Sequence, residues 1–133
     1  MATGDAPRIR AGQVTPAPDG PHVEQVGWGV ARQVARLLAE QVDDPLLARL
    51  PGLAEAPGHL VHVLFERRTA TAASLVELVG DTGFYRGDVV LPGAVAEARL
   101  ALVVRASYDA AAAGATWLSV PGATDDLRPL GLG

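Results

Sequence analysis

The chain contains no cysteine among its 133 residues. This absence excludes disulfide-stapled scaffolds, thiolate zinc sites, iron–sulfur clusters and cysteine nucleophiles. Lysine and asparagine are also absent, so all 11 basic side chains are arginine. Together with the abundance of alanine, glycine, proline and valine, this usage is typical of a GC-rich bacterial genome. The arginine content by itself therefore says little about function.

Long apolar segments are missing as well. No stretch approaches the roughly 18 uninterrupted apolar residues that a membrane-spanning helix requires, and the N-terminal segment lacks the apolar core of a signal peptide. We therefore expect a cytoplasmic protein without a membrane partner. The formal net charge of -4 and the pI near 5.2 argue against nucleic acid as a partner, because phosphate contacts require local positive charge. The chain length predicts one globular domain.

The apolar pattern predicts a mainly α fold with three main helices. Between residues 22 and 43, valines and leucines recur at spacings of three and four, which indicates an amphipathic helix. That helix must end before the prolines of residues 45–58, which suit a short proline-initiated turn of helix and a connector. The same spacing predicts helices over residues 58–80 and 94–114. Residues 116–120 are predicted to form a short strand.

Two of these helices have strand alternatives. Residues 59–66 are rich in β-branched and aromatic side chains, and residues 98–108 alternate in polarity, so an α+β fold with a small antiparallel sheet is the second interpretation. We expect a proline-rich extended arm over residues 1–21. One globular domain should follow over residues 22–120, and a poorly ordered tail over residues 121–133.

A cluster of histidine and glutamate is the sharpest candidate for chemistry. On a helix, His59, His62 and Glu66 would share one face, and two imidazoles with a carboxylate are a ligand set of zinc and non-heme iron sites. This cluster supports an alternative hypothesis, a small metal-dependent or anion-binding enzyme subunit with a divalent metal. The solvated face of an amphipathic helix explains the same residues without a ligand. In the strand interpretation the two histidines point to opposite faces. No other cofactor is predicted.

Residues 80–88 form the expected functional loop, because they are rich in glycine and include Tyr85 and Arg86. We interpret these two side chains as candidate ligand-binding residues. The adjacent arginines Arg67 and Arg68 are candidates for holding an anion. An ordinary turn and ordinary surface charge are the competing explanations.

The first predicted helix carries a Gly–Trp–Gly sequence. A glycine inside a helix costs roughly 1 kcal/mol relative to alanine, and a close helix contact would explain that cost. Gly27 and Ala31 lie four residues apart, where they would permit a close crossing, and Trp28 would project as an anchor. Packing of Trp28 at the edge of the core is the alternative. The leading hypothesis is therefore a non-catalytic helical protein-interaction module, an adaptor or oligomeric subunit, whose partner is another protein or a second copy of the chain.

Overall fold

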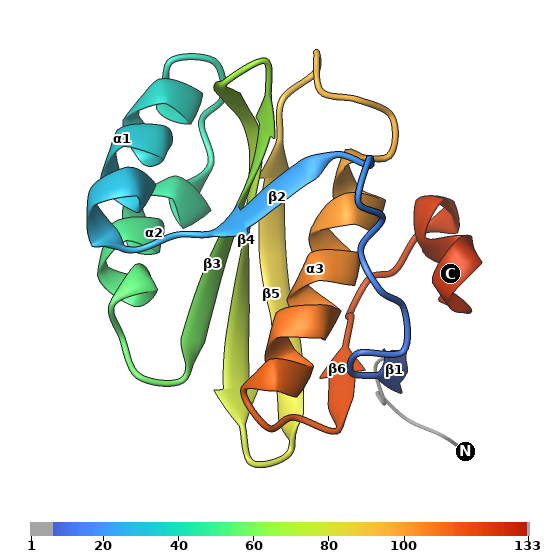
Figure 1. The fold of residues 1–133 in the computed structure, drawn as a ribbon. Helices are drawn as coiled ribbons and strands as arrows, with labels where there is room; N and C mark the ends of the chain where they lie inside the picture. The colour runs from blue at the N-terminus through green and yellow to red at the C-terminus, as the bar shows by residue number, and fades with distance from the viewer. Residues whose placement is uncertain (1–6, 133) are drawn as a thin grey trace.

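A computed structural model describes residues 7–132 of the chain. Its centre is a six-stranded sheet with the strand order β1-β6-β5-β4-β3-β2 (Figure 1). The neighbours β5 and β6 run parallel, and the other neighbouring pairs are antiparallel. The elements in chain order are β1 (Arg8–Arg10), β2 (His22–Gln25), α1 (Trp28–Ala39), α2 (Pro45–Ala54), β3 (His59–Glu66), β4 (Thr69–Val79), β5 (Thr82–Val90), α3 (Ala98–Ala112), β6 (Trp117–Ser119) and the 3-10 helix η1 (Asp125–Leu130).

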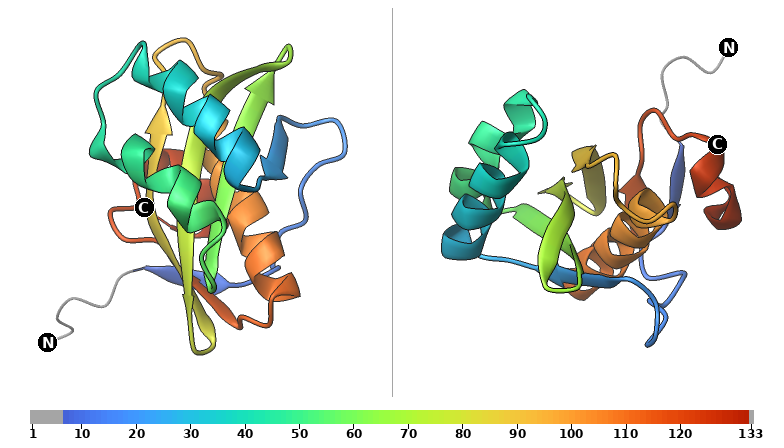
Figure 2. Two further views of the ribbon diagram at one scale, coloured as in Figure 1. Left: turned by 90° about the vertical axis from the view of Figure 1, so that its left-hand side faces the viewer. Right: turned by 90° about the horizontal axis from the view of Figure 1, so that it is seen from above.

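Helices cover both faces of the sheet. α1 and α2 pack on one face against β3, β4 and β5, whereas α3 lies on the other face and contacts β2, β3, β4 and β5 (Figure 2). Each layer has its own core. The α1/α2 core includes Leu38, Leu50 and Val63, and the α3 core includes Leu64 and Leu102. All five side chains are fully buried, so burial of apolar area on both faces holds the three layers together.

The prediction of a mainly α fold is wrong, because residues 58–80 form the antiparallel strands β3 and β4 rather than a helix. Helices cover both faces of these strands, so neighbouring side chains are buried on opposite sides. The sequence then loses the polar–apolar alternation of a half-exposed strand, and spacings of three and four arise among its many apolar residues. Arg67 and Arg68, with φ of 52° and 68°, form the tight turn that joins the two strands.

The first predicted helix divides into a strand and a helix. β2 pairs with β3, and α1 begins only at Trp28, with the extended residue Gly27 as its N-cap. As predicted, the helix ends before Pro45, which is itself the first residue of α2. Contrary to the prediction of a short turn, α2 continues through Pro51 to Ala54.

The segment predicted as a glycine-rich loop is the strand β5, paired with β4. Its Gly83 is required by packing rather than by flexibility, because a Cβ there would lie 3.3 Å from the Ala110 Cβ of α3. α3 lies within the predicted helical region, and β6 confirms the predicted short strand. Since β5 and β6 are parallel, β5, α3 and β6 form a βαβ unit, in which α3 begins near the carboxyl end of β5.

Both ends of the described chain pack onto the sheet and its helices. β1 is the edge strand beside β6, and its Ile9 joins the α3 core. η1 buries Leu127 and Leu130 in the same core. The division into an arm (1–21), a domain and a tail (121–133) stays a prediction. Within residues 7–132, no helix combines the length and the hydropathy that crossing a membrane requires.

Candidate functional site

The parallel strands β5 and β6 separate soon after they meet. They pair from Thr82 opposite Trp117 to Phe84 opposite Ser119, and β5 then continues without pairing to β6. A cavity of about 380 Å³ lies at this opening. In open sheets, ligands bind beyond the carboxyl ends of parallel strands, so the opening is the candidate functional site. The cavity is lined by Tyr85, Arg86, Gly87, Asp88, Arg99, Val120, Pro121, Gly122 and Leu127.

A β-bulge in β5 lies at the same place. The pairing with β4 shifts by one residue there, and Arg86 is the extra residue. Because of this shift, Tyr85 and Asp88, three positions apart, lie on the same face of the strand, and their side chains are hydrogen-bonded. Gly87 has a φ of 153°, a conformation that favours glycine. The bulge therefore turns two polar side chains toward α3 beside the opening.

The carboxylate of Asp88 joins β5 to α3. Arg99 donates from Nε to Asp88 Oδ2 (2.9 Å) and from Nη2 to Oδ1 (3.1 Å), and the Tyr85 hydroxyl donates to Oδ2 (2.8 Å). Burial, followed by the charge of Asp88, raises the pKa of Tyr85 well above its usual value. The hydrogen bond to Asp88 raises the pKa of Arg99. Tyr85 is therefore a neutral donor, and Arg99 is a permanent cation beside the cavity.

The first turn of α3 presents unpaired backbone donors. Its N-cap residue, Glu97, makes no side-chain cap, and the backbone amides of Arg99 and Leu100 have no hydrogen-bond acceptor within the described residues. Helix N-termini carry partial positive charge, and the Arg99 guanidinium, whose own charge is balanced by Asp88, adds N–H donors nearby. This combination suits an anionic ligand group, in particular a phosphate.

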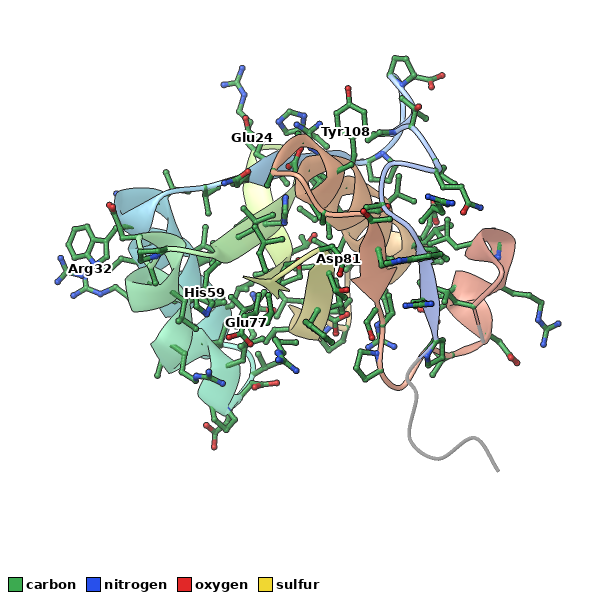
Figure 3. The ribbon with its side chains drawn as sticks, turned by 90° about the horizontal axis from the view of Figure 1, so that it is seen from below. Glu24, Arg32, His59, Glu77, Asp81 and Tyr108 are labelled. Carbon is green, nitrogen blue, oxygen red and sulfur yellow. The ribbon has the colours of Figure 1, made fainter. Side chains whose placement is uncertain are left out.

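A second group of polar side chains lies on the opposite face of the sheet. His59, Glu77 and Phe84 are cross-strand neighbours on β3, β4 and β5, and Figure 3 shows His59 and Glu77 close together beside α2. Arg86 donates to Glu77 Oε1 through Nε (2.9 Å), and its Cζ lies 4.7 Å from the centroid of the Phe84 ring. His59 Nδ1 is 2.9 Å from the Pro57 carbonyl oxygen, so this nitrogen carries the proton of the neutral ring. The free lone pair is then on Nε2, 3.9 Å from Glu77 Oε2.

The predicted metal cluster does not form. Because β3 is a strand, His59 and His62 point to opposite faces of the sheet. His62 is fully buried under α3, with Nε2 2.8 Å from Asp109 Oδ2. Glu66 ends the strand, and its carboxylate accepts a hydrogen bond from the Thr71 hydroxyl. In the part of the chain that the structure describes, no three His, Asp or Glu side chains converge as metal ligands.

The residues predicted as an interface do not form one surface. Trp28 is 45% exposed at the start of α1, whereas Ala31 is buried in the α1/α2 core. Gly27 precedes the helix, so it does not destabilise the helix interior. A close helix crossing is therefore not required to explain this glycine.

The four residues predicted to bind a ligand lie in two separate places. Tyr85 and Arg86 line the cavity, and their role in ligand binding stays a prediction. Arg67 and Arg68 form the β3–β4 turn and are not among the residues that line the cavity. The structure therefore does not unite the four side chains in one site.

Three features of the opening were not predicted from the sequence: Asp88, Arg99 and the bulge at Gly87. The bulge has a sequence signal, because a glycine inside an otherwise regular strand often marks one. The ion pair between Asp88 and Arg99 depends on how α3 crosses β5, and the sequence carries no signal for that crossing.

Comparison with known proteins identifies the fold. No protein-family profile and no curated protein sequence matches the chain. Among solved structures, the aminoglycoside N-acetyltransferase AAC(6')-Iy in complex with CoA matches with a TM-score of 0.61 and 14% identity, over 81% of this chain and 84% of that one. A GCN5-related N-acetyltransferase from Kribbella flavida matches with a TM-score of 0.62 and 16% identity, over 95% and 52%. The fold is that of the GCN5-related N-acetyltransferases. A ribosomal-protein-alanine N-acetyltransferase from Brucella melitensis biovar Abortus 2308 shares this acetyltransferase fold, with a TM-score of 0.59 and 14% identity over 84% and 87%.

The acetyltransferase fold corrects the function predicted from the sequence. The solved structures named above that share it are acetyltransferases, which contradicts a non-catalytic helical interaction module or adaptor. No group of metal ligands among residues 7–132 supports the alternative of a metal-dependent enzyme. Among them are complexes with CoA and with the aminoglycoside sisomicin, whereas we predicted a protein partner or a second copy of the chain. CoA also belongs to a ligand class that the sequence did not indicate.

Proposed function

We propose that this chain is a CoA-dependent N-acyltransferase, an enzyme that moves an acyl group from a CoA thioester to a primary amine. The observation that carries the proposal is the opening between β5 and β6, with its cavity beside the first turn of α3. The fold supports the same function, since AAC(6')-Iy shares it and was solved with CoA.

The residues around the opening fit the chemical parts of CoA, which joins a diphosphate to an extended arm with two amide groups and a terminal thiol. The unpaired amides of Arg99 and Leu100 and the Arg99 guanidinium are donors for the diphosphate. Beyond Phe84, the edge of β5 that faces away from β4 pairs with no strand of residues 7–132, and such an edge accepts an extended, amide-containing chain. Bound there, an acyl-CoA would supply a thioester that is open to attack by an amine.

Two sets of groups near the opening can serve the reaction. In the bulge, the extra residue Arg86 has no partner on β4, so we propose its backbone amide as the donor for a carbonyl oxygen that gains negative charge. On the opposite face, Glu77 and the free Nε2 of His59 are acceptors for the proton that the attacking ammonium group must lose. Glu77 is the closer of the two to the opening, because it is the cross-strand partner of Phe84.

Acetyl-CoA binding and thiol release test this proposal. Because the chain has no cysteine, a thiol reagent detects released CoA without background from the protein. We expect the purified chain to bind acetyl-CoA and to release CoA when a primary amine is supplied. Glu77→Gln should lower kcat and leave acetyl-CoA binding unchanged.

A pair of arginine variants locates the binding site. Arg99→Ala should weaken acetyl-CoA binding by at least about fivefold, which corresponds to roughly 1 kcal/mol. Arg128→Ala removes an exposed arginine on η1 and should leave binding unchanged. If the wild-type chain does not bind acetyl-CoA at millimolar concentration, the proposed function is refuted.

A further inference from the structure

The part of the sheet that α1 and α2 leave open is rich in arginine and aromatic side chains. Both helices lie over β3, β4 and β5, and β6 and β1 extend beyond them (Figure 2). Ile9 and Leu118 are buried in the α3 core, so the residues before and after them point to the open face. We call this surface the arginine face. It consists of Arg8, Arg10 and Trp117, together with the half-buried Phe84 and the exposed Arg86 of the adjoining strand β5.

The arginine face holds guanidinium groups by stacking. Trp117 contacts two of them, with Arg8 Cζ at 4.1 Å and Arg10 Cζ at 5.1 Å from the ring centroid. Both arginines are exposed, and neither has a carboxylate within 4.0 Å among residues 7–132. Stacking orients a planar guanidinium and leaves its N–H groups free to donate. Such groups are suited to bidentate binding of a carboxylate or a phosphate.

The arginine face adjoins the place where an acceptor amine must arrive. Phe84, one of its residues, is opposite Ser119 in the last pair before β5 and β6 separate. The cavity in which we place CoA is lined by residues 85–88 of β5, by Arg99 of α3 and by residues that follow β6. Of the arginine face only Arg86 belongs to this lining, so Arg8, Arg10 and Trp117 stay available to the acceptor. The charge of Glu77 on that face is balanced by Arg86 (2.8 Å). Asp81, whose backbone oxygen accepts a hydrogen bond from Trp117 N (3.2 Å), offsets one of the two charges of Arg8 and Arg10, so one positive charge stays in excess.

On the basis of the proposed function, we infer that the acceptor is a primary amine that also carries a phosphate or carboxylate group. The anionic group lies on the arginine face, and the amine points toward Glu77 and His59. A polycationic acceptor is disfavoured, because its charges are repelled by the same arginines. In this respect the chain differs from the aminoglycoside acetyltransferase that shares its fold and was solved with sisomicin.

A binding experiment tests the anion site without relying on activity. The chain has two tryptophans, so Trp28→Phe leaves Trp117 as the sole tryptophan reporter of the arginine face. Fluorescence is followed during titration with phosphoethanolamine, β-alanine and ethanolamine. We expect a saturable change with one or both anionic amines and none with ethanolamine, and the two anionic arms distinguish phosphate from carboxylate. No saturable change with either anionic amine, or an equal change with ethanolamine, would overturn the inference.

Two double variants in the Trp28→Phe background assign the site. Arg8→Gln with Arg10→Gln keeps side chains that cover Trp117 but removes both charges, and should weaken binding of the anionic amine at least about tenfold. Arg32→Ala with Arg36→Ala removes two positive charges from α1 and should leave binding unchanged. Equal effects of the two double variants would show that only net charge matters and would overturn the inference.

Kinetics separates this inference from the proposed function. With acetyl-CoA as donor, the Arg8/Arg10 variant should raise KM for the anionic amine at least about tenfold and leave KM for acetyl-CoA and the rate with ethanolamine unchanged. Acetyl transfer without preference for anionic amines would overturn the inference and leave the acyltransferase standing. Saturable binding to the arginine face by a chain that does not bind acetyl-CoA would refute the acyltransferase and leave the anion site standing.

Discussion

Replacement of Asp88 by alanine would leave two donors without their acceptor. The Tyr85 hydroxyl, on a side chain that is 6% exposed, loses its hydrogen-bond acceptor at a cost of about 1–2 kcal/mol. Arg99 loses a bidentate partner, but its side chain is 36% exposed and water recovers part of the interaction, so we assign about 1 kcal/mol to it. The free energy of unfolding should fall by about 2–3 kcal/mol. For 133 residues this lowers Tm by about 7–11 °C.

Thermal unfolding followed by circular dichroism at pH 7 measures this loss. Asp88→Asn keeps an oxygen for the Tyr85 hydroxyl but no charge for Arg99, so it should cost only about 1 kcal/mol. Asp126→Asn is the matched control, because its carboxylate lies 4.0 Å from Arg99 Nη1 on the surface and should contribute less than about 0.5 kcal/mol. If Asp88→Ala and Asp126→Asn unfold at the same temperature, the carboxylate does not hold β5 to α3, and our account of the cavity wall is refuted.

Three further predictions concern the layers around the site. Asp109→Ala leaves the fully buried His62 without a partner at Nε2 and should cost about 2 kcal/mol in urea unfolding at pH 7; no loss would show that His62 finds another partner. Burial by itself raises the pKa of Asp109, but the hydrogen bonds and charges of His62 and Arg105 outweigh it and lower that pKa below 3.8. The ionised Asp109 carboxylate therefore stabilises the fold above about pH 3.8, and this stabilisation is lost as the pH falls through the folded-state pKa. The difference in the free energy of unfolding between wild type and Asp109→Ala should shrink in urea unfolding near pH 3. Gly83→Val introduces a Cβ 3.3 Å from the Ala110 Cβ and should lower the free energy of unfolding by about 1–3 kcal/mol in the same urea assay. The control Gly93→Ala introduces a Cβ with no neighbour within 4 Å and should change that free energy by less than about 0.5 kcal/mol.

The prediction from sequence succeeded where one local signal dominates. Pro45 has a fixed φ and no amide hydrogen, so it both limits α1 and starts α2. The apolar run of α3 also has the helical spacing that its buried face requires. The prediction failed for β3 and β4, because helices cover both of their faces and the alternation that identifies a strand is lost. It failed again at β5, where Gly83 signals the close approach of α3 rather than a loop.

In the candidate site, too, some residues were predicted from the sequence and others depend on tertiary packing. Tyr85 and Arg86 were predicted as ligand-binding residues from composition alone, and both line the cavity. Asp88 and Arg99 were not predicted, because they are 11 residues apart on different elements and meet only when α3 crosses β5. Glu77 was missed for the same reason, since the register of β4 with β5 places it opposite Phe84.

By itself, the sequence determined the absence of thiol chemistry, the start of a helical segment at Pro45, the long helix α3 and the short strand β6. Composition, fixed backbone angles and helical spacing are local properties, and short segments carry them in full. The tertiary structure alone decided that β5 and β6 run parallel and separate, that Asp88 meets Arg99, and that arginines from β1 stack on Trp117. These relations depend on strand register and helix crossing, which the packing of the whole chain sets and no single segment specifies.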